Sequence, residues 1–269
     1  MVDPLLSVAY RFILAGLILF AFCLITGKRM KFNPKEHFLM LLLGLSLFGI
    51  NYWFVYKAEM VLTSGFVAVI FSLIIFFNIF FNAILLKGKI KKDVIFGAFL
   101  GVTGTALLFK NELKTFNLNG EDLLILLFCL GGLVSASLGN ILSAYKQKRK
   151  IPVLQSNAFG MLYGGVSMFL TVLIFDKPVT FDFSMNYVLS LIYLAIFGSI
   201  IAFSVYLKLL GEIGPDRSIY IALITPAIAM VISTIFEGYN WDLFAFLGIT
   251  FLFAGNFLVL RFKTQKSIL

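Results

Sequence analysis

The sequence predicts an all-α membrane protein, a polytopic helical bundle, and three observations lead to this fold class. Hydrophobic residues make up 61% of the 269 residues and charged residues only 13%, whereas charged residues are near a quarter of a soluble domain. The apolar residues gather in runs of about 17–25 residues, which is the length that crosses a bilayer. Short charged clusters separate these runs, which a soluble protein with a very large core would not require.

Nine apolar runs are long enough to cross a hydrocarbon core of ~30 Å as helices that rise ~1.5 Å per residue. Helix is the form in which a single segment satisfies its own backbone polar groups in lipid. The connections are short, so one bundle without a soluble domain is expected. The nine predicted spans are residues 5–26, 37–57, 65–86, 94–110, 121–145, 153–175, 186–208, 217–236 and 243–261.

The loops between the spans alternate in charge, and this alternation predicts the orientation of the chain. The positive-inside rule places the side with more lysine and arginine in the cytoplasm, which puts the C-terminus inside and Met1 outside. Orientation in a cytoplasmic (inner) membrane therefore accounts for the net charge of +9 without a nucleic-acid partner. The richer side carries 17 basic residues: Lys28, Arg29, Lys31, Lys35, Lys87, Lys89, Lys91, Lys92, Lys146, Lys148, Arg149, Lys150, Lys208, Arg217, Arg261, Lys263 and Lys266, against Lys57, Lys110, Lys114 and Lys177 on the other side.

Landmark residues recur in the same order about 150 positions apart, and the two copies run through the membrane in opposite directions. This is an inverted-topology repeat, which is typical of secondary transporters. The halves are residues 1–118 with four spans and 119–269 with five. Span 121–145 has no counterpart before Pro4, so we expect that a first helix was lost or lies upstream of Met1. The recurring landmarks are Pro4 with Pro152, Tyr56 with Tyr206, Gly97 with Gly248, and Gly104 with Gly255.

Short motifs follow one another in a characteristic order along nearly the whole chain. They are Pro4 with Tyr10-Arg11-Phe12 and Ala15, Tyr56-Lys57-Ala58 leading to Ser64, Gly97 with Gly101 and Gly104, the stretch from Tyr206 to Pro226, and Glu237 followed by Gly248 and Gly255. In this order the chain resembles the EamA-type branch of the drug/metabolite transporter superfamily, whose members have ten helices in two inverted halves. The sequence departs from the family at Lys87-Gly88-Lys89, where a Gly-Glu pair is common, and at the reversed pair Glu237-Gly238.

The resemblance implies a carrier of small metabolites with its cavity between the halves. The cavity would be lined from spans 37–57, 65–86, 121–145, 186–208 and 217–236. Such a neutral and partly aromatic lining suits a zwitterionic or weakly polar molecule, of which an amino acid is one example. Each polar side chain has a second interpretation, because interhelical hydrogen bonds in lipid use the same residue types. The candidate substrate-binding residues are Arg11, Asn51, Tyr52, Ser72, Asn78, Asn140, Ser199, Tyr220 and Thr225.

Arg11 is the only charge well inside a predicted span. A cation there costs ~2.5–3.5 kcal/mol on insertion scales and therefore needs a partner or a water-filled cavity. It could be the counter-ion of a substrate carboxylate, or a structural residue bonded to helix carbonyls, and we favour the structural interpretation. No Asp or Glu lies deep in a span, which favours facilitated exchange or export, while Glu59 and Glu237 keep proton coupling open.

Secondary transport by alternating access is thus the predicted function. The alternative is a non-transporting homologue or a structural membrane subunit. No set of acids, bases or metal ligands converges, so neither an enzyme nor a cofactor is expected, and Cys23 and Cys129 are interpreted as packing residues. The expected partners are a small-molecule substrate and the lipid bilayer, with a homodimer left open.

Overall fold

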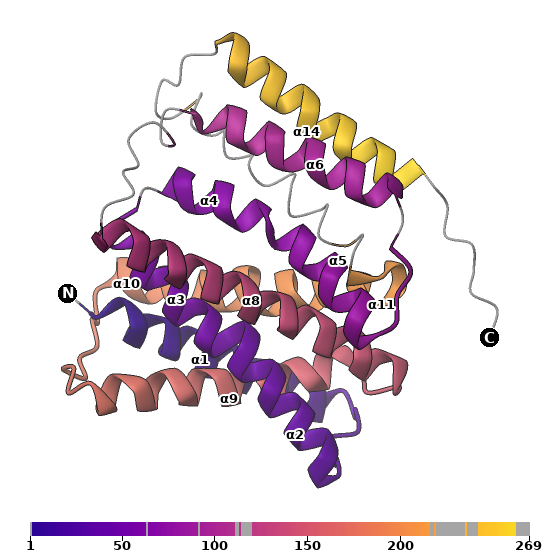
Figure 1. Ribbon diagram of the computed structural model, residues 1–269. Coiled ribbons are helices and arrows are strands. Elements are labelled where there is room, and N and C mark those ends of the chain that lie inside the picture. Colours follow the sequence, from indigo (N-terminus) through magenta and orange to yellow (C-terminus); the bar gives the residue numbers. More distant parts are fainter. Residues whose placement is uncertain are drawn as a thin grey trace.

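Helices and the short segments that join them make up the part of the chain that this computed structural model describes, namely residues 2–62, 64–90, 92–110, 113, 120–215, 218, 235 and 242–261. This part contains no strand (Figure 1), which confirms the predicted helical fold class. Most of the predicted span 217–236 lies outside it. Five of its helices are long and apolar enough to cross a membrane: Pro4–Ile25, Pro34–Glu59, Leu123–Lys148, Val153–Ile174 and Met185–Ile213; Val69–Leu85 and Leu243–Gly255 are shorter apolar helices.

The helix starts follow local sequence signals. Asp3 caps the first helix by accepting a hydrogen bond from the Leu5 backbone, 2.9 Å away. Asn33 and Glu36 form a reciprocal capping box around Pro34, which satisfies backbone donors that have no partner inside the helix. The elements are α1 (Pro4–Ile25), α2 (Pro34–Leu43), η1 (Gly44–Ile50), α3 (Asn51–Glu59), α4 (Ser64–Ser72), α5 (Ile74–Leu85), α6 (Lys92–Leu108), α8 (Gly120–Lys148), α9 (Val153–Ile174), α10 (Met185–Tyr193), η2 (Leu194–Ile201), α11 (Ala202–Ile213) and α14 (Leu243–Arg261).

Two of these elements, η1 and η2, are π-helices inside longer α-helices. They begin 150 positions apart, at Gly44 and Leu194, and end 151 positions apart, at Ile50 and Ile201. The π form is rare and often marks functional sites. Its occurrence at two matched positions is therefore a specific feature of this chain.

Helices α1 and α9 pack closely and run antiparallel. A methyl group on Gly16 would lie 2.9 Å from the Leu162 backbone nitrogen, and one on Gly165 would lie 2.8 Å from that of Ile13. Both distances are too short for a real side chain, so only glycine permits this approach of the two backbones. Small residues at helix interfaces are the usual means of close packing in lipid.

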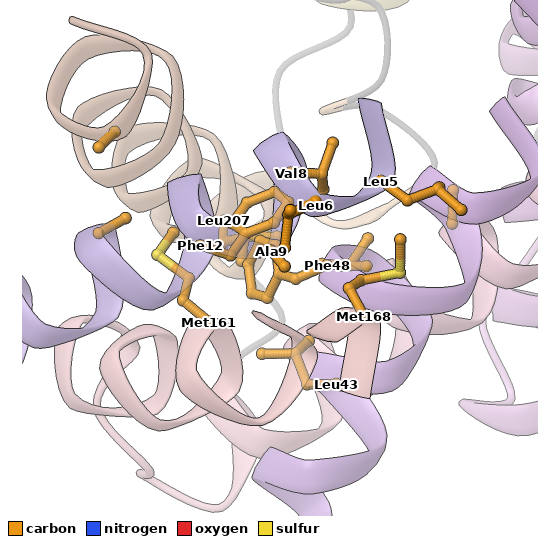
Figure 2. Packing of buried hydrophobic residues seen from close by; sticks show 14 of the residues in the cluster. Leu5, Leu6, Val8, Ala9, Phe12, Leu43, Phe48, Met161, Met168 and Leu207 are labelled. Carbon is orange, nitrogen blue, oxygen red and sulfur yellow. The ribbon is translucent and has the colours of Figure 1, made fainter. Parts of the chain in front are cut away.

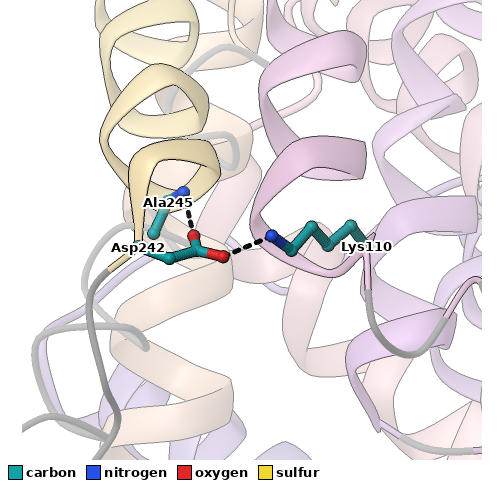
Figure 3. Close-up of polar contacts among 3 residues, drawn as sticks. All are labelled: Lys110, Asp242 and Ala245. Carbon is teal, nitrogen blue, oxygen red and sulfur yellow. Dashed lines mark hydrogen bonds and ion pairs between the residues drawn. The ribbon is translucent and has the colours of Figure 1, made fainter.

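Helices α6 and α14 form a second antiparallel pair at one edge of the bundle, with α4 and α5 between it and the other helices (Figure 1). A methyl group on Gly104 would lie 2.6 Å from the Gly248 carbonyl oxygen, and one on Gly255 equally close to that of Gly97. At the end of this pair Lys110 forms an ion pair with Asp242, whose other oxygen accepts from the Ala245 backbone (Figure 3).

The largest hydrophobic core cluster lies where α1, η1, α9, η2 and α11 meet (Figure 2). Phe12 and Phe48 are both fully buried there, with ring centroids 5.1 Å apart. Phe203 packs edge-on against Phe48 at 4.9 Å. This aromatic packing links η1 to α1 and to α11.

The start of α1 is tied to the segment that joins α9 to α10. Lys177 donates to the Asp3 carboxylate at 2.5 Å, and Tyr10 donates to the Thr180 carbonyl at 3.2 Å. Burial opposes the ionisation of Asp3, but the Lys177 hydrogen bond and the Leu5 backbone bond outweigh it, so the pKa of Asp3 lies below its usual value. The ionised form of Asp3 therefore stabilises this end of the bundle.

Candidate functional site

A buried polar cluster joins α5, α8 and the segment after α11. Asn78 of α5 is fully buried at its centre. Its side-chain amide donates to the Pro215 carbonyl at 3.1 Å. Its oxygen accepts from the Ser137 hydroxyl at 2.6 Å and, more weakly, from the Asn140 amide at 3.5 Å. Two of the predicted site residues, Asn78 and Asn140, are thus brought together.

Several polar atoms in this cluster keep unused hydrogen-bonding capacity within the described residues. The Asn140 oxygen, the Tyr206 hydroxyl and the Ser218 hydroxyl are buried without a hydrogen bond of good geometry, although Tyr206 faces both Asn140 and Ser218. Leaving a buried polar group unpaired costs ~1–3 kcal/mol. Because these three groups face one another, they can pair among themselves or bind a small polar solute.

Arg11, Tyr52 and Ser199 form a second group, between α1, α3 and η2. Arg11 donates from Nε to the Ser199 hydroxyl at 2.8 Å and from Nη2 to the Gly198 carbonyl at 2.9 Å. Its guanidinium also lies over the Tyr52 ring, 5.7 Å from the centroid. These are the helix partners that the structural interpretation of Arg11 requires.

The π-helix η2 provides the acceptors for Arg11. In a π-helix the backbone bonds follow an i→i+5 pattern, which displaces carbonyl groups from the α-helical register. The Ser199 side-chain hydroxyl donates to the Leu194 carbonyl five residues earlier at 3.1 Å, while Gly198 carries no side chain that would block Arg11. The irregular helix thus accommodates the half-buried cation.

A small pocket borders Arg11 on its α10 side. It holds about 80 Å³ and is lined by side chains of α1, α3, α10 and η2, among them Ser7, Tyr56, Tyr187 and Ser190. Ordinary small-molecule sites hold ~300–1,000 Å³. The pocket is therefore too small for a metabolite unless the surrounding helices move apart.

The remaining predicted residues do not join either group. Ser72 donates to the Val69 carbonyl of its own helix at 2.6 Å, which is a local bond. Asn51 faces Gly132 of α8, and its side-chain oxygen is buried without a partner in the described part of the chain. Tyr220 and Thr225 lie outside the described residues.

Sequence reasoning did not select Ser137, Tyr206 or Ser218 as site residues, and it placed Lys146 in a loop after a span ending at 145. Helix α8 instead continues to Lys148, and Lys146 is 2% exposed and donates to the Ser156 hydroxyl. Asn140, Ser143 and Lys146 recur three positions apart, so they share a helix face. This spacing was the signal that could have identified the buried lysine.

Curated relatives cover most of the chain. The chain is 30% identical over 234 residues to a protein of Escherichia coli (strain K12) named as an uncharacterized inner membrane transporter, YedA, with 86% of this chain and 73% of that protein covered. It is 23% identical to an uncharacterized transporter of Clostridium kluyveri, with 98% of this chain and 85% of that protein covered. It is 22% identical to Protein PagO of Salmonella typhimurium, with 96% of this chain and 84% of that protein covered.

A solved crystal structure has the same fold, with a TM-score of 0.79 over 96% of this chain and 89% of the other at 17% identity. The sequence model of the EamA-like transporter family matches residues 1–110 and 123–261. These matches confirm the resemblance drawn from the motifs and identify a membrane transporter. The chain belongs to the EamA-like transporter family.

Proposed function

We propose that this protein is a secondary transporter, which moves a small polar metabolite across the cytoplasmic membrane by alternating access of two inverted halves. The observation that carries the proposal is the buried cluster around Asn78, in which α5 of the first half meets α8 of the second through side-chain hydrogen bonds. A site between the repeats is the usual arrangement in such carriers. The loop charges support a cytoplasmic C-terminus.

The contacts between the halves support the inverted repeat. Residues 13 and 162 are 149 positions apart, and so are 16 and 165. If each residue is replaced by its counterpart 149 positions away in the other half, the Gly16–Leu162 contact becomes the Gly165–Ile13 contact, and both are observed. With an offset of 151 positions, the Gly104–Gly248 contact becomes in the same way the observed Gly255–Gly97 contact. Such reciprocal contacts are expected on either side of a pseudo-two-fold axis.

The chemistry of the cluster defines a substrate class. Within the described part of the chain, the buried groups of the cluster that lack a hydrogen bond of good geometry are an amide oxygen on Asn140 and two hydroxyls on Tyr206 and Ser218. Hydroxyls donate and accept, an amide oxygen accepts, and none of the three carries a charge at neutral pH. A zwitterionic or weakly polar solute such as an amino acid fits these groups better than a phosphorylated one, which would need several cations.

The two bonds of Arg11 to η2 support a positioning role for this residue. The pocket beside it is smaller than a metabolite site, so substrate entry requires α1 and α10 to separate. The π-helix η2 lies at this contact, and π segments inside α-helices frequently occur at functional sites. The matched π-helix η1 packs on α9, where a methyl group on Gly44 would lie 2.3 Å from the Gly160 carbonyl oxygen.

Counterflow in proteoliposomes tests the proposal. Vesicles are loaded with a pool of unlabelled amino acids, and uptake of the labelled pool is followed with and without a pH gradient. We expect uptake by the wild type. Asn140→Ala should raise the KM about tenfold, because one buried hydrogen bond of ~1–1.5 kcal/mol is lost. The control variant Asn82→Ala on α5 should change the KM little. Correctly folded protein that catalyses no uptake of any solute of this class would favour the non-transporting alternative.

A further inference from the structure

An open groove lies where α2 begins and α8 ends, outside both polar groups of the candidate site. It holds about 340 Å³ and is lined by Pro34, Lys35, Phe38, Leu39, Tyr145 and Arg149. Both helix ends belong to the basic side of the membrane that the loop charges place in the cytoplasm. The groove therefore lies at the level of the lipid headgroups.

Two cations face this groove without an acidic partner. Neither Lys35 nor Arg149 forms an ion pair within the described residues. The nearest acid in sequence, Glu36, is engaged elsewhere, because its carboxylate accepts from the Asn33 backbone at 2.8 Å in the capping box. The groove thus offers uncompensated positive charge.

Tyr145 fixes one of the two cations. The Arg149 guanidinium lies over the Tyr145 ring, 4.7 Å from its centroid. A stacked guanidinium keeps its N–H donors in a defined plane, which matches the oxygen atoms of a phosphate. Tyrosine is itself enriched at the membrane interface, where its ring faces the acyl chains and its hydroxyl faces water.

The wall of the groove below the charges is apolar. Phe38 is 57% exposed and follows Lys35 by one helical turn, with Leu39 beside it. An anion bound between Lys35 and Arg149 would therefore have hydrocarbon surface directly beneath it. This combination favours an amphipathic anion over a soluble one.

We propose that this groove binds the headgroup of an anionic phospholipid of the cytoplasmic leaflet. The phosphate accepts hydrogen bonds from Arg149 and Lys35, and an acyl chain packs along Phe38 and Leu39. Basic pockets between helix ends on the cytoplasmic side are suited to anionic lipids. The choice of leaflet depends on the proposed orientation, whereas the lipid class depends only on the groove.

The test is a titration of the purified full-length chain in detergent with phosphatidylglycerol and with phosphatidylcholine, followed by native mass spectrometry. The variant is Lys35→Gln/Arg149→Gln. The matched control is Arg29→Gln/Lys31→Gln, because Arg29 also stacks on an aromatic ring, that of Phe32 at 5.5 Å, on the same basic side. Arg149→Lys retains the charge but not the planar donors.

We expect selective binding of phosphatidylglycerol that weakens about fivefold for each cation removed, so about 25-fold for the groove double variant, and less than twofold for the control. Arg149→Lys should have an intermediate effect. Equal losses in the groove and control variants would overturn the proposal, since general surface charge would then explain the binding. Equal competition by glycerol phosphate would also overturn it, because a soluble anion would then suffice.

Discussion

Replacing Asn78 by leucine removes the central residue of the buried polar cluster while nearly preserving its volume. The change deletes the bond to the Pro215 carbonyl at 3.1 Å and the bonds from Ser137 at 2.6 Å and Asn140 at 3.5 Å. It also leaves the Ser137 hydroxyl and the Pro215 carbonyl without these partners. Asn78 is fully buried, so water cannot replace the lost bonds directly.

The expected cost follows from the number and length of these bonds. Interhelical hydrogen bonds in membrane proteins average ~0.6 kcal/mol and reach ~1.7 kcal/mol. Two of the three bonds have good length and the third lies at the limit of a hydrogen bond. Asn78→Leu should therefore lower the free energy of unfolding by about 1–3 kcal/mol.

Unfolding in mixed detergent micelles measures this loss, and a double-mutant cycle with Ser137→Ala isolates one bond. The cycle should give a coupling energy of about 0.6 kcal/mol or more, because each single variant removes the same hydrogen bond. Asn82→Leu, the same substitution one turn further along α5, is the matched control. Equal losses for the Asn78 and Asn82 variants, or no coupling with Ser137, would refute the described cluster.

Three further predictions address helix packing, the half-buried Arg11 and the pH dependence of stability. Gly165→Ala should destabilise the protein by about 1–3 kcal/mol through overpacking. Gly160→Ala should destabilise it by less, because a methyl group on Gly160 meets side-chain atoms no closer than 3.3 Å. Thermal unfolding compares the two variants, and equal losses of stability would contradict the α1–α9 packing. Arg11→Gln should reduce folded yield and the unfolding temperature, since two charge-assisted bonds are lost; normal folding with loss of carboxylate substrates alone would instead indicate a counter-ion. The pKa values of Asp3 and Asp242 are depressed, so their contribution to stability is present above the ordinary pKa of about 4 and is lost as the pH falls through the folded values. Asp3→Asn should therefore flatten the acid side of a plot of unfolding temperature against pH. An unchanged slope would show that the Lys177 bond does not form.

The sequence was informative about helices because lipid forces long apolar runs into that form. The run predicted over 153–175 is helix Val153–Ile174, and the run over 5–26 is Pro4–Ile25. The π-helices were not predicted from the sequence; in the structure η1 packs on α9 and η2 packs on α1. Their matched positions only became visible in three dimensions.

The substrate-binding role of the candidate residues stays a prediction. Residue type, together with the cavity-lining spans that the family resemblance implies, selected Asn78, Asn140 and Ser199. This reasoning gave no distances across the bundle, so the separation into two groups could not be foreseen. Lys146 was missed because a basic residue next to Arg149 and Lys150 resembles an ordinary loop cluster.

Two-sided access to the polar cluster tests the proposed mechanism most directly. Ser137→Cys, in a background with Cys23 and Cys129 replaced by alanine, would be treated with a membrane-impermeant thiol reagent in right-side-out and inside-out vesicles. Controls are Asp182→Cys in the α9–α10 segment, which should react in one orientation only, and Leu127→Cys, at a position that is 54% exposed on an apolar helix, which should react in neither. Alternating access predicts that the thiol introduced by Ser137→Cys reacts in both orientations and that substrate protects it. Reaction from a single side, or from neither, in vesicles that transport substrate would contradict a site exposed in turn to the two sides of the membrane.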